Sequence, residues 1–531
     1  MQQGSFLSLV FNAHLPFVRQ VDSDCIREER YLFERLSDTY IPFLKMLDRL
    51  DADRIPFKIA VSFSPTLCHM LRDKLLIEKY LAYMDKQIEF GKRELDRTSS
   101  DSELNRLARH YYDTAVDNKF IFTERYQNDI LGVFELFRKK GKIEFLTTAV
   151  THSFLPFFTG YPESIQAQIE LALSSHRSYF DKNPLGFWLP ELGWSPELDS
   201  YLRAYNIHYT IVNTHGFVLG NPLPKYGSFY PVKTPAGVEV FSNDFYSVKD
   251  LWDKNDGFAY DPHYRDSERD AGYENAAEDL SPFIEAGCPR IPTGYKYWSK
   301  GKDHLHSKIY NLDEARNKAR KHAKVFLDRR VERLVLAAKD MDVPPISLWA
   351  SNIDDFGHQW YEGIEFLDQL FRNAAQRTDI QFVLPGDYLS NCPVNSYQTV
   401  VPVFSSWGSN GYAETWLESS NDWVYRHISR AINRMIELAE RFPDESGLNE
   451  RALNQAAREI LLIQASDWPK MISNNNNADF AKHQIESSLR NFTAIFEALG
   501  SSYASPEWLT VMEETNNIFP SINYRVFRKK R

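Results

Sequence analysis

Short apolar runs that end in polar residues recur through the first four hundred positions of the chain. Runs of this length without alternation of apolar and polar residues are typical of buried parallel strands. Helical periodicity lies between them, for example over Asp313 to Val331, and this alternation predicts an α/β barrel or a doubly wound sheet. The predicted strands are Phe6 to Phe11, Phe57 to Phe63, Ile143 to Val150, Phe187 to Leu189, Tyr209 to Val212 and Ile346 to Trp349.

Two regions depart from this alternation. Residues 75 to 140 are highly charged and helix-prone with few strand signals, which predicts a helical insertion. After about residue 395 the pattern changes to long amphipathic helices. We therefore expect a barrel domain over residues 1–395, with the insertion at 75–140, and a C-terminal all-helical domain over 396–531.

Composition narrows the class of ligand. The chain has 531 residues and is 43% hydrophobic, which is enough for several packed units. Aromatic residues reach 14%, more than core packing requires, and indicate surfaces that stack on ring-shaped ligands such as sugars. Lys and Arg number 62 against 72 Asp and Glu, a net charge of −10, which argues against nucleic acid or an anionic membrane as partner. A neutral substrate fits better.

The cysteines and the N-terminal segment bear on the cellular compartment in which the protein folds. Cys25, Cys68, Cys288 and Cys392 are far apart and show no CxxC spacing, so the sequence predicts neither a disulfide framework nor a zinc site. The first residues lack the pattern of a secretory signal, and no apolar run is long enough to span a bilayer. We expect a cytoplasmic protein with no membrane segment.

Two acidic positions follow predicted strands, where a barrel presents its chemistry. Glu191 comes directly after the aromatic run that begins at Gly186; alternatively, it caps a helix that begins near Ser195. Asp354 and Asp355 follow the strand that ends near Trp349. Retaining glycosidases use two carboxyl groups about 5 Å apart, one as nucleophile and one as acid, so this pairing suits glycoside chemistry.

Histidines and tryptophans near these positions each have two interpretations. Each of four histidines could bind a metal or a sugar, or be buried in the core: His14, His152, His215 and His358. None of them has the HExxH spacing of a zinc site, so we predict no metal. The tryptophan rings could stack on a pyranose or pack in the core. They are Trp252, Trp298, Trp360, Trp407, Trp416 and Trp468.

Seven motifs, in order along nearly the whole chain, closely resemble the family 57 glycoside hydrolases of the α-amylase and 1,4-α-glucan branching enzyme type. They are NAHLPFVR at 12–19, SPTL at 64–67, THSFLPFF at 151–158, GFWLPELGW at 186–194, FGHQWYEG at 356–363, SSWGSNGYAETWLESSNDWVYRH at 405–427 and RALNQAAREILLIQASDWP at 451–469.

The resemblance implies an incomplete seven-stranded (β/α) barrel with a helical insertion, a C-terminal helical domain that closes the cleft, and a retaining mechanism on α-glucan without metal or cofactor. By motif match Glu191 takes the position of the nucleophile, and His14 and His152 match cleft histidines. The positions that match glucan contacts are Trp252, Trp407, Trp416, Asp467 and Trp468.

The chain departs from the family pattern at four positions. The acid/base aspartate of the family falls on Asn352, and a missing general acid costs about a hundred to ten thousandfold in rate. Asn12, Asn213 and Pro292 replace a histidine, an aspartate and a histidine that are common in the family. In an extended segment Asp354 would share a side with Asn352, which makes Asp354 the candidate acid.

Three functions are compatible with these residues. The first is branching, in which a glycosyl-enzyme on Glu191 passes its chain to the 6-hydroxyl of another glucan. The second is hydrolysis of α-1,4-glucan by an α-amylase, and the third is a catalytically degenerate glucan-binding protein. We place branching first. The partner expected in each case is an α-glucan such as glycogen, starch, amylose or a maltooligosaccharide, and the oligomeric state is open.

Overall fold

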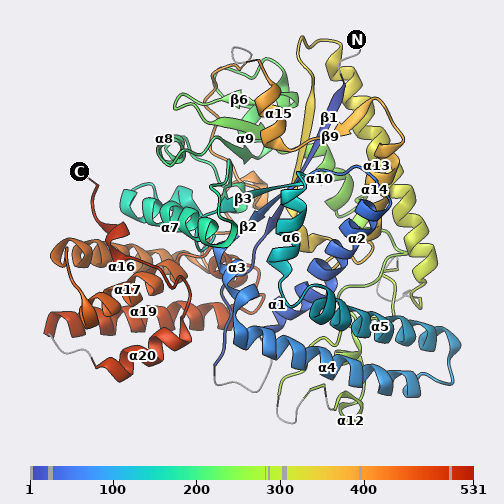
Figure 1. Cartoon of the computed structure of the whole chain (residues 1–531), viewed down its shortest axis with the longest axis horizontal. Helices are drawn as coiled ribbons and strands as arrows, with labels where there is room; N and C mark the ends of the chain where they lie inside the picture. The colour runs from blue at the N-terminus through green and yellow to red at the C-terminus, as the bar shows by residue number, and fades with distance from the viewer. Residues whose placement is uncertain are drawn as a thin grey trace.

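A curled sheet of mostly parallel strands forms the centre of the molecule (Figure 1). The computed structural model describes residues 4–21, 28–281, 283–284, 288–301, 308–393, 397–501 and 505–530. Within these residues the strands are β1 Ser5–Ala13, β2 Ile59–Phe63, β3 Ile143–Thr148, β4 Gly186–Trp188, β5 Tyr209–Val212, β6 Val232–Lys233, β7 Glu239–Ser242, β8 Ile346–Asn352 and β9 Ile380–Phe382.

The order of the strands confirms the incomplete barrel. Seven parallel strands of the described residues run in the order β7-β5-β4-β3-β2-β1-β8. The two ends of this sheet meet at a single bridge, where Asp244 N donates to Leu348 O at 2.7 Å and Ala350 N donates to Asn243 Oδ1 at 2.9 Å. Strand β6 pairs antiparallel with β7, and β9 pairs with the start of β1.

The six strands predicted from apolar runs correspond to β1 to β5 and β8, whereas β6, β7 and β9 were not predicted. These three are two to four residues long and include polar residues such as Glu239, so no apolar run marks them. The first five predicted strands and β8 each end at the same edge of the barrel, because parallel strands share their direction.

The helical insertion forms as expected. It contains α4 Lys74–Arg97, α5 Ser102–Phe120, the π-helix η2 Ile121–Arg125 and α6 Ile130–Lys139. Each of the three α-helices begins after an aspartate whose side chain accepts a backbone N–H of the first turn: Asp73, Asp101 and Asp129. Figure 1 shows α4 and α5 side by side at the edge of the barrel.

The C-terminal helices gather on one side of the barrel (Figure 1). They are α16 Asp422–Arg441, α17 Gly447–Ile463, α18 Asp467–Ser473, α19 Ala478–Ser501 and α20 Pro506–Thr515. The segment before them, residues 397–412, pairs instead with the barrel through the bridges Trp194–Ser405, Asn221–Val401 and Lys233–Thr399. The helical region is therefore anchored to the barrel before its first helix begins.

The remaining helices surround the sheet or extend its loops. They are α1 Arg30–Arg35, the π-helix η1 Leu36–Tyr40, α2 Ile41–Ala52, α3 Pro65–Arg72, η3 Leu155–Phe158, α7 Pro162–Phe180, η4 Pro190–Leu192, α8 Leu198–Ala204, α9 Thr214–Val218, η5 Gly227–Phe229, α10 Phe245–Trp252, η6 Phe258–Tyr260, α11 Ala271–Glu274, α12 Ala277–Leu280, α13 Leu312–Ala338, η7 Ile353–Asp355, α14 Gly363–Ala375, α15 Pro385–Asn391, η8 Ser409–Gly411 and η9 Tyr524–Phe527. Among the described residues, none of the helices combines the length and apolar character that a bilayer crossing requires.

One expectation about the cysteines is wrong. Cys288 is disulfide-bonded, whereas Cys68 and Cys392 are free thiols, and Cys25 lies outside the described residues. The wide sequence separation that argued against a disulfide carries no information about which cysteines the fold brings together.

Candidate active site

Glu191 lies at the C-terminal edge of the barrel, in the 3-10 turn η4 that follows β4. Glu191 is 3% exposed, and its φ of 59° places a residue other than glycine in the left-handed region. Such backbone strain persists only where the surrounding structure fixes it, and it clusters at functional sites. Trp407 Nε1 donates a hydrogen bond to Glu191 Oε2 at 2.6 Å, so two residues predicted for the site are in direct contact.

The C-terminal region supplies two further partners of Glu191. Lys470 Nζ lies 3.4 Å from Glu191 Oε2, and Ser466 Oγ lies 3.4 Å from Oε1. Negative charge on Glu191, followed by that on Asp467 and Asp354, raises the pKa of the Lys470 amine. Sequence reasoning missed Lys470, although it lies three residues after Asp467 on α18, on the same helix face.

The two cleft histidines stack on each other beside Glu191. The rings of His14 and His152 lie 3.8 Å apart between centroids and 7° from parallel. His14 Nε2 and Asp467 Oδ2 are 2.9 Å apart, and His152 Nδ1 lies 3.1 Å from Ser466 Oγ. Burial, reinforced by His14 and Lys470, lowers the pKa of His152 well below its usual value, so this imidazole is neutral at pH 7.

Three potential metal ligands lie close together at this point, namely His14, His152 and Asp467. One donor atom from each falls within 4.8 Å of the others, a separation at which they could share one ion. Zinc sites arrange their donors tetrahedrally around the ion. Two imidazoles stacked in parallel do not direct nitrogen lone pairs at one common point. The three residues therefore do not fit a shared ion in this arrangement, and the absence of a catalytic metal stays a prediction.

Two asparagines lie at the positions where the resemblance described above leads us to expect a histidine and the acid/base aspartate. Asn12 and Asn352 are direct partners in the register between β1 and β8. Asn12 Nδ2 donates to Asn352 Oδ1 at 3.2 Å, and it lies 3.4 Å from His152 Nε2. Neither amide titrates at neutral pH, so this pair does not supply a proton to a leaving oxygen.

The two aspartates of the same loop have different surroundings. Asp354 lines the same cavity as Glu191, with Arg35 Nε 3.5 Å from its Oδ2. Asp355 accepts a hydrogen bond from Ser351 Oγ at 2.9 Å and does not line that cavity. The loop is the 3-10 turn η7 and not the extended segment assumed from the sequence, yet Asp354 and Asn352 do face the same space.

The cavity has a volume of about 920 Å³, part of which is open to solvent. Both the barrel and the C-terminal helices form its wall. The expected site residues among its lining are His14, His152, Glu191, Asp354 and Asp467, together with Asn12, Asn352 and Lys470.

Four tryptophans expected to contact glucan lie in different surroundings. Trp407 bonds to Glu191 and packs edge-on against Trp188. None of the four is among the residues that line the cavity. Trp416 is 1% exposed and stacks on Phe154, Trp468 is 2% exposed and donates to a backbone carbonyl, and Trp252 packs against Phe356 and Trp360. In this arrangement the rings of Trp416 and Trp468 serve packing and offer no open face to a sugar.

Two family models match the chain. The model of glycosyl hydrolase family 57 covers residues 8–297, and the C-terminal model of 1,4-alpha-glucan branching enzyme covers residues 427–527. The chain is 25% identical to the 1,4-alpha-glucan branching enzyme TK1436 of Thermococcus kodakarensis, over 97% of this chain and 77% of that protein.

Solved structures show the same architecture over the whole chain. The alpha-amylase AmyC of Thermotoga maritima matches with a TM-score of 0.92 and 32% identity, over 100% of both chains. The GH57-type branching enzyme of Pyrococcus horikoshii matches with a TM-score of 0.89 and 25% identity, over 100% of this chain and 97% of that chain. The first family model spans more than half of the chain, and the chain therefore belongs to glycosyl hydrolase family 57.

Proposed function

We propose that this protein is a retaining 1,4-α-glucan branching enzyme with Glu191 as nucleophile. The observation that carries the proposal is the buried, strained Glu191 at the barrel edge, held by Trp407 and Lys470 in an open cavity. The match to the branching enzyme C-terminal model and the relationship to the Thermococcus enzyme support transfer over hydrolysis.

The reaction requires two carboxyl groups in turn. Glu191 attacks the anomeric carbon, and the bond from that carbon to the leaving glucan oxygen breaks as Asp354 protonates the oxygen. The 6-hydroxyl of a second glucan then attacks the same carbon, gives its proton to Asp354 and releases Glu191. Asp354 takes this role because it is the carboxyl group of the loop that lines the cavity with Glu191.

A second candidate is a glucan-binding protein without catalysis, and the Asn12–Asn352 pair favours it. The two amides bond to each other where the family places its acid/base aspartate. In that case the wild type would bind glucan without changing it. Asn352→Asp would then be the variant that introduces activity, since Asn12 Nδ2 still donates to position 352.

Hydrolysis is the third candidate, and the similarity of the chain to the Thermotoga alpha-amylase supports it.

Incubation of the full chain with amylose separates these functions. Iodine absorbance, reducing ends and α-1,6 linkages by proton NMR are followed for the wild type, Glu191→Gln and Glu197→Gln. Glu197 is an exposed carboxylate outside the cavity and serves as the control. New α-1,6 linkages that vanish only in Glu191→Gln support branching, and new reducing ends without such linkages favour hydrolysis. Bound glucan with no change in any signal favours the degenerate protein and overturns the proposal.

A further inference from the structure

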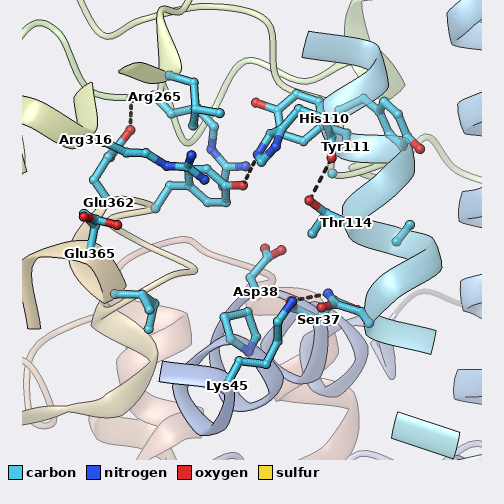
Figure 2. A pocket seen from close by; sticks show the side chains of 18 of the residues that line it. Ser37, Asp38, Lys45, His110, Tyr111, Thr114, Arg265, Arg316, Glu362 and Glu365 are labelled. Atoms are coloured by element: carbon cyan, nitrogen blue, oxygen red, sulfur yellow. Dashed lines mark hydrogen bonds between the residues drawn. The ribbon is translucent and has the colours of Figure 1, made fainter. Parts of the chain in front are cut away.

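A second large cavity lies between the helical insertion and the barrel, and it shares no lining residue with the cavity of Glu191. Its volume, which includes space open to solvent, is about 1080 Å³. Figure 2 shows Asp38 pointing into it from η1, and His110, Tyr111 and Thr114 lying along α5 on one side of it. The loop that carries Arg265 and the first turns of α13 and α14 complete the wall.

Arg265 is a buried cation in this cavity, and the charges of Asp38 and Glu362 stabilise it without a direct ion pair. It is 4% exposed, and within the described part of the chain its guanidinium forms no ion pair and its Nε has no hydrogen-bond partner. The guanidinium lies over the ring of Tyr361, 3.8 Å from the centroid. Burying a charge without a direct ion pair is costly, so a buried guanidinium that lines a cavity suits an anionic ligand.

Arg316 gives the cavity a second unpaired guanidinium. It lies on α13, half-buried, and among the described residues it has no ion pair either. The other cations of the lining are engaged, since Lys45 pairs with Asp117 and Arg49 Nη2 lies 3.2 Å from Asp368 Oδ2. Two guanidiniums are thus left facing the hollow.

The pKa of His110, which also lines the cavity, is lowered in part by the positive charges around it. Burial, followed by the charges of Arg316, Arg265 and Lys45, lowers the pKa of His110 to about 4. Its imidazole is therefore neutral at pH 7, and its Nε2 lies 2.7 Å from the Tyr361 hydroxyl oxygen. Burial is the larger cause, and the added effect of the three cations indicates a positive electrostatic potential around His110.

Three carboxylates also line the cavity, and each has at least one oxygen engaged, whereas Glu362 Oε2 is buried without a partner among the described residues. Glu365 accepts from Arg320 at 2.6 Å, and Glu362 accepts from the Tyr310 hydroxyl at 2.6 Å and from Arg265 N at 3.0 Å. Asp38 Oδ2 lies 3.3 Å from His358 Nδ1, while the side chain itself points into the hollow. The lining thus carries both signs of charge, with Arg265 and Arg316 free of direct ion pairs among the described residues and the Asp38 carboxylate available as an acceptor.

We propose that this cavity binds a sugar phosphate. The phosphate pairs with the guanidiniums of Arg265 and Arg316, whose planar forks match its oxygens. The sugar lies among the tyrosine rings of the lining, and its hydroxyls donate to Asp38. A free sugar leaves both guanidiniums unpaired, and inorganic phosphate leaves the rings and Asp38 unused. The site is independent of the chemistry at Glu191.

Isothermal titration of the full chain with glucose 6-phosphate tests the proposal. Arg316→Gln removes a half-buried guanidinium from a helix surface and so leaves the fold intact, and Arg265→Gln removes the buried one. Lys324→Gln is the matched control, since it removes the same charge from an exposed position of the same helix outside the cavity. Charged hydrogen bonds to phosphate are strong, so each arginine variant should weaken binding by at least about tenfold.

Glucose and inorganic phosphate are titrated alongside. Glucose 6-phosphate that binds more tightly than either, with affinity lost in Arg316→Gln and kept in Lys324→Gln, supports the proposal. Equal affinity for inorganic phosphate overturns the sugar part of the assignment. No binding of glucose 6-phosphate, or binding that Arg316→Gln leaves unchanged, overturns the site.

Discussion

Asp354 and Asp355 are adjacent carboxyl groups, and we expect only the first to act on substrate. Asp354→Asn should lower the rate of glucan transfer by about a hundred to ten thousandfold, the range that loss of a general acid produces. The rate on amylose, followed by iodine absorbance, provides the measurement. A variant that keeps full activity would show that another group protonates the leaving oxygen, and Asp354 would then be a cleft residue only.

Asp355 should instead set the pH dependence of stability. Loss of hydration, together with the charge of Asp354, raises the pKa of Asp355 to about 7. A carboxyl group whose pKa is raised on folding favours the protonated folded state, so its contribution to stability is lost as pH rises from about 4 through about 7. Asp355→Asn keeps an acceptor for Ser351 and removes this titration.

The variant should therefore exceed the wild type in the free energy of unfolding by on the order of 1 to 3 kcal/mol at pH 8 and by much less at pH 4. Thermal unfolding of both proteins at the two pH values checks this. A difference that is equal at both pH values, or larger at pH 4, would contradict the raised pKa.

Single residues of the site differ in how far the sequence could predict them. Glu191 was predicted as a site residue because an acid directly after an apolar aromatic run lies at a barrel edge, and its role as nucleophile was predicted by motif match. Lys470 was not found, because a lysine on a helix carries no signal until the fold brings that helix to Glu191. Asp354 was predicted from the alternation of an extended strand, whereas the loop is a 3-10 turn that leads to the same side.

At the scale of elements, the π-helix η1 and the loop after η7 are in backbone contact at Gly357. Gly357 has a φ of 98°, and a Cβ there would overlap the backbone carbonyl oxygen of Asp38 in η1. Gly357→Ala should therefore lower the free energy of unfolding by about 1–3 kcal/mol, since it combines an unfavourable φ with a backbone overlap. It should also lower activity, because Asp354 lies three residues before the displaced glycine.

Chemical denaturation and the rate on amylose measure the two effects. Gly160→Ala is the control, because Gly160 has no positive φ and open space around its Cβ position. The prediction is contradicted if Gly357→Ala is as stable and as active as Gly160→Ala.

Elements with a strong local pattern were predicted well, and those defined by their neighbours were not. The long apolar run of β1 identifies it as a buried strand, and the aspartate caps help to mark α4 and α5. Strand β7 has four residues and exists because β5 and β6 pair with it. The register that sets Asn12 beside Asn352 is likewise a property of two strands 340 residues apart, and neither segment encodes it alone.

At the scale of the molecule, buried polar contacts join the barrel to the C-terminal region on several sides of the site. Thr151 Oγ1 donates to Leu461 O at 2.7 Å, Trp194 Nε1 donates to Pro402 O at 3.1 Å, and Ser153 pairs with Ala465 in a β-bridge. Separation of the two regions would leave these groups, and the fully buried Trp194 and Trp416, without partners.

We therefore expect the two regions to unfold together. Tryptophan fluorescence and far-ultraviolet circular dichroism should give coincident denaturation curves, although the chain is longer than most two-state domains. Ser164→Ala removes a buried hydroxyl on α7 that donates to Gln464 Oε1 at 3.0 Å, just beyond α17, and should shift both curves equally by about 1 kcal/mol. Ser200→Ala, at an exposed hydroxyl on α8 that bonds only within its own turn, should shift neither. Two separated transitions would instead mean that the site forms between bodies that fold independently, and the position of Lys470 beside Glu191 would then depend on their docking.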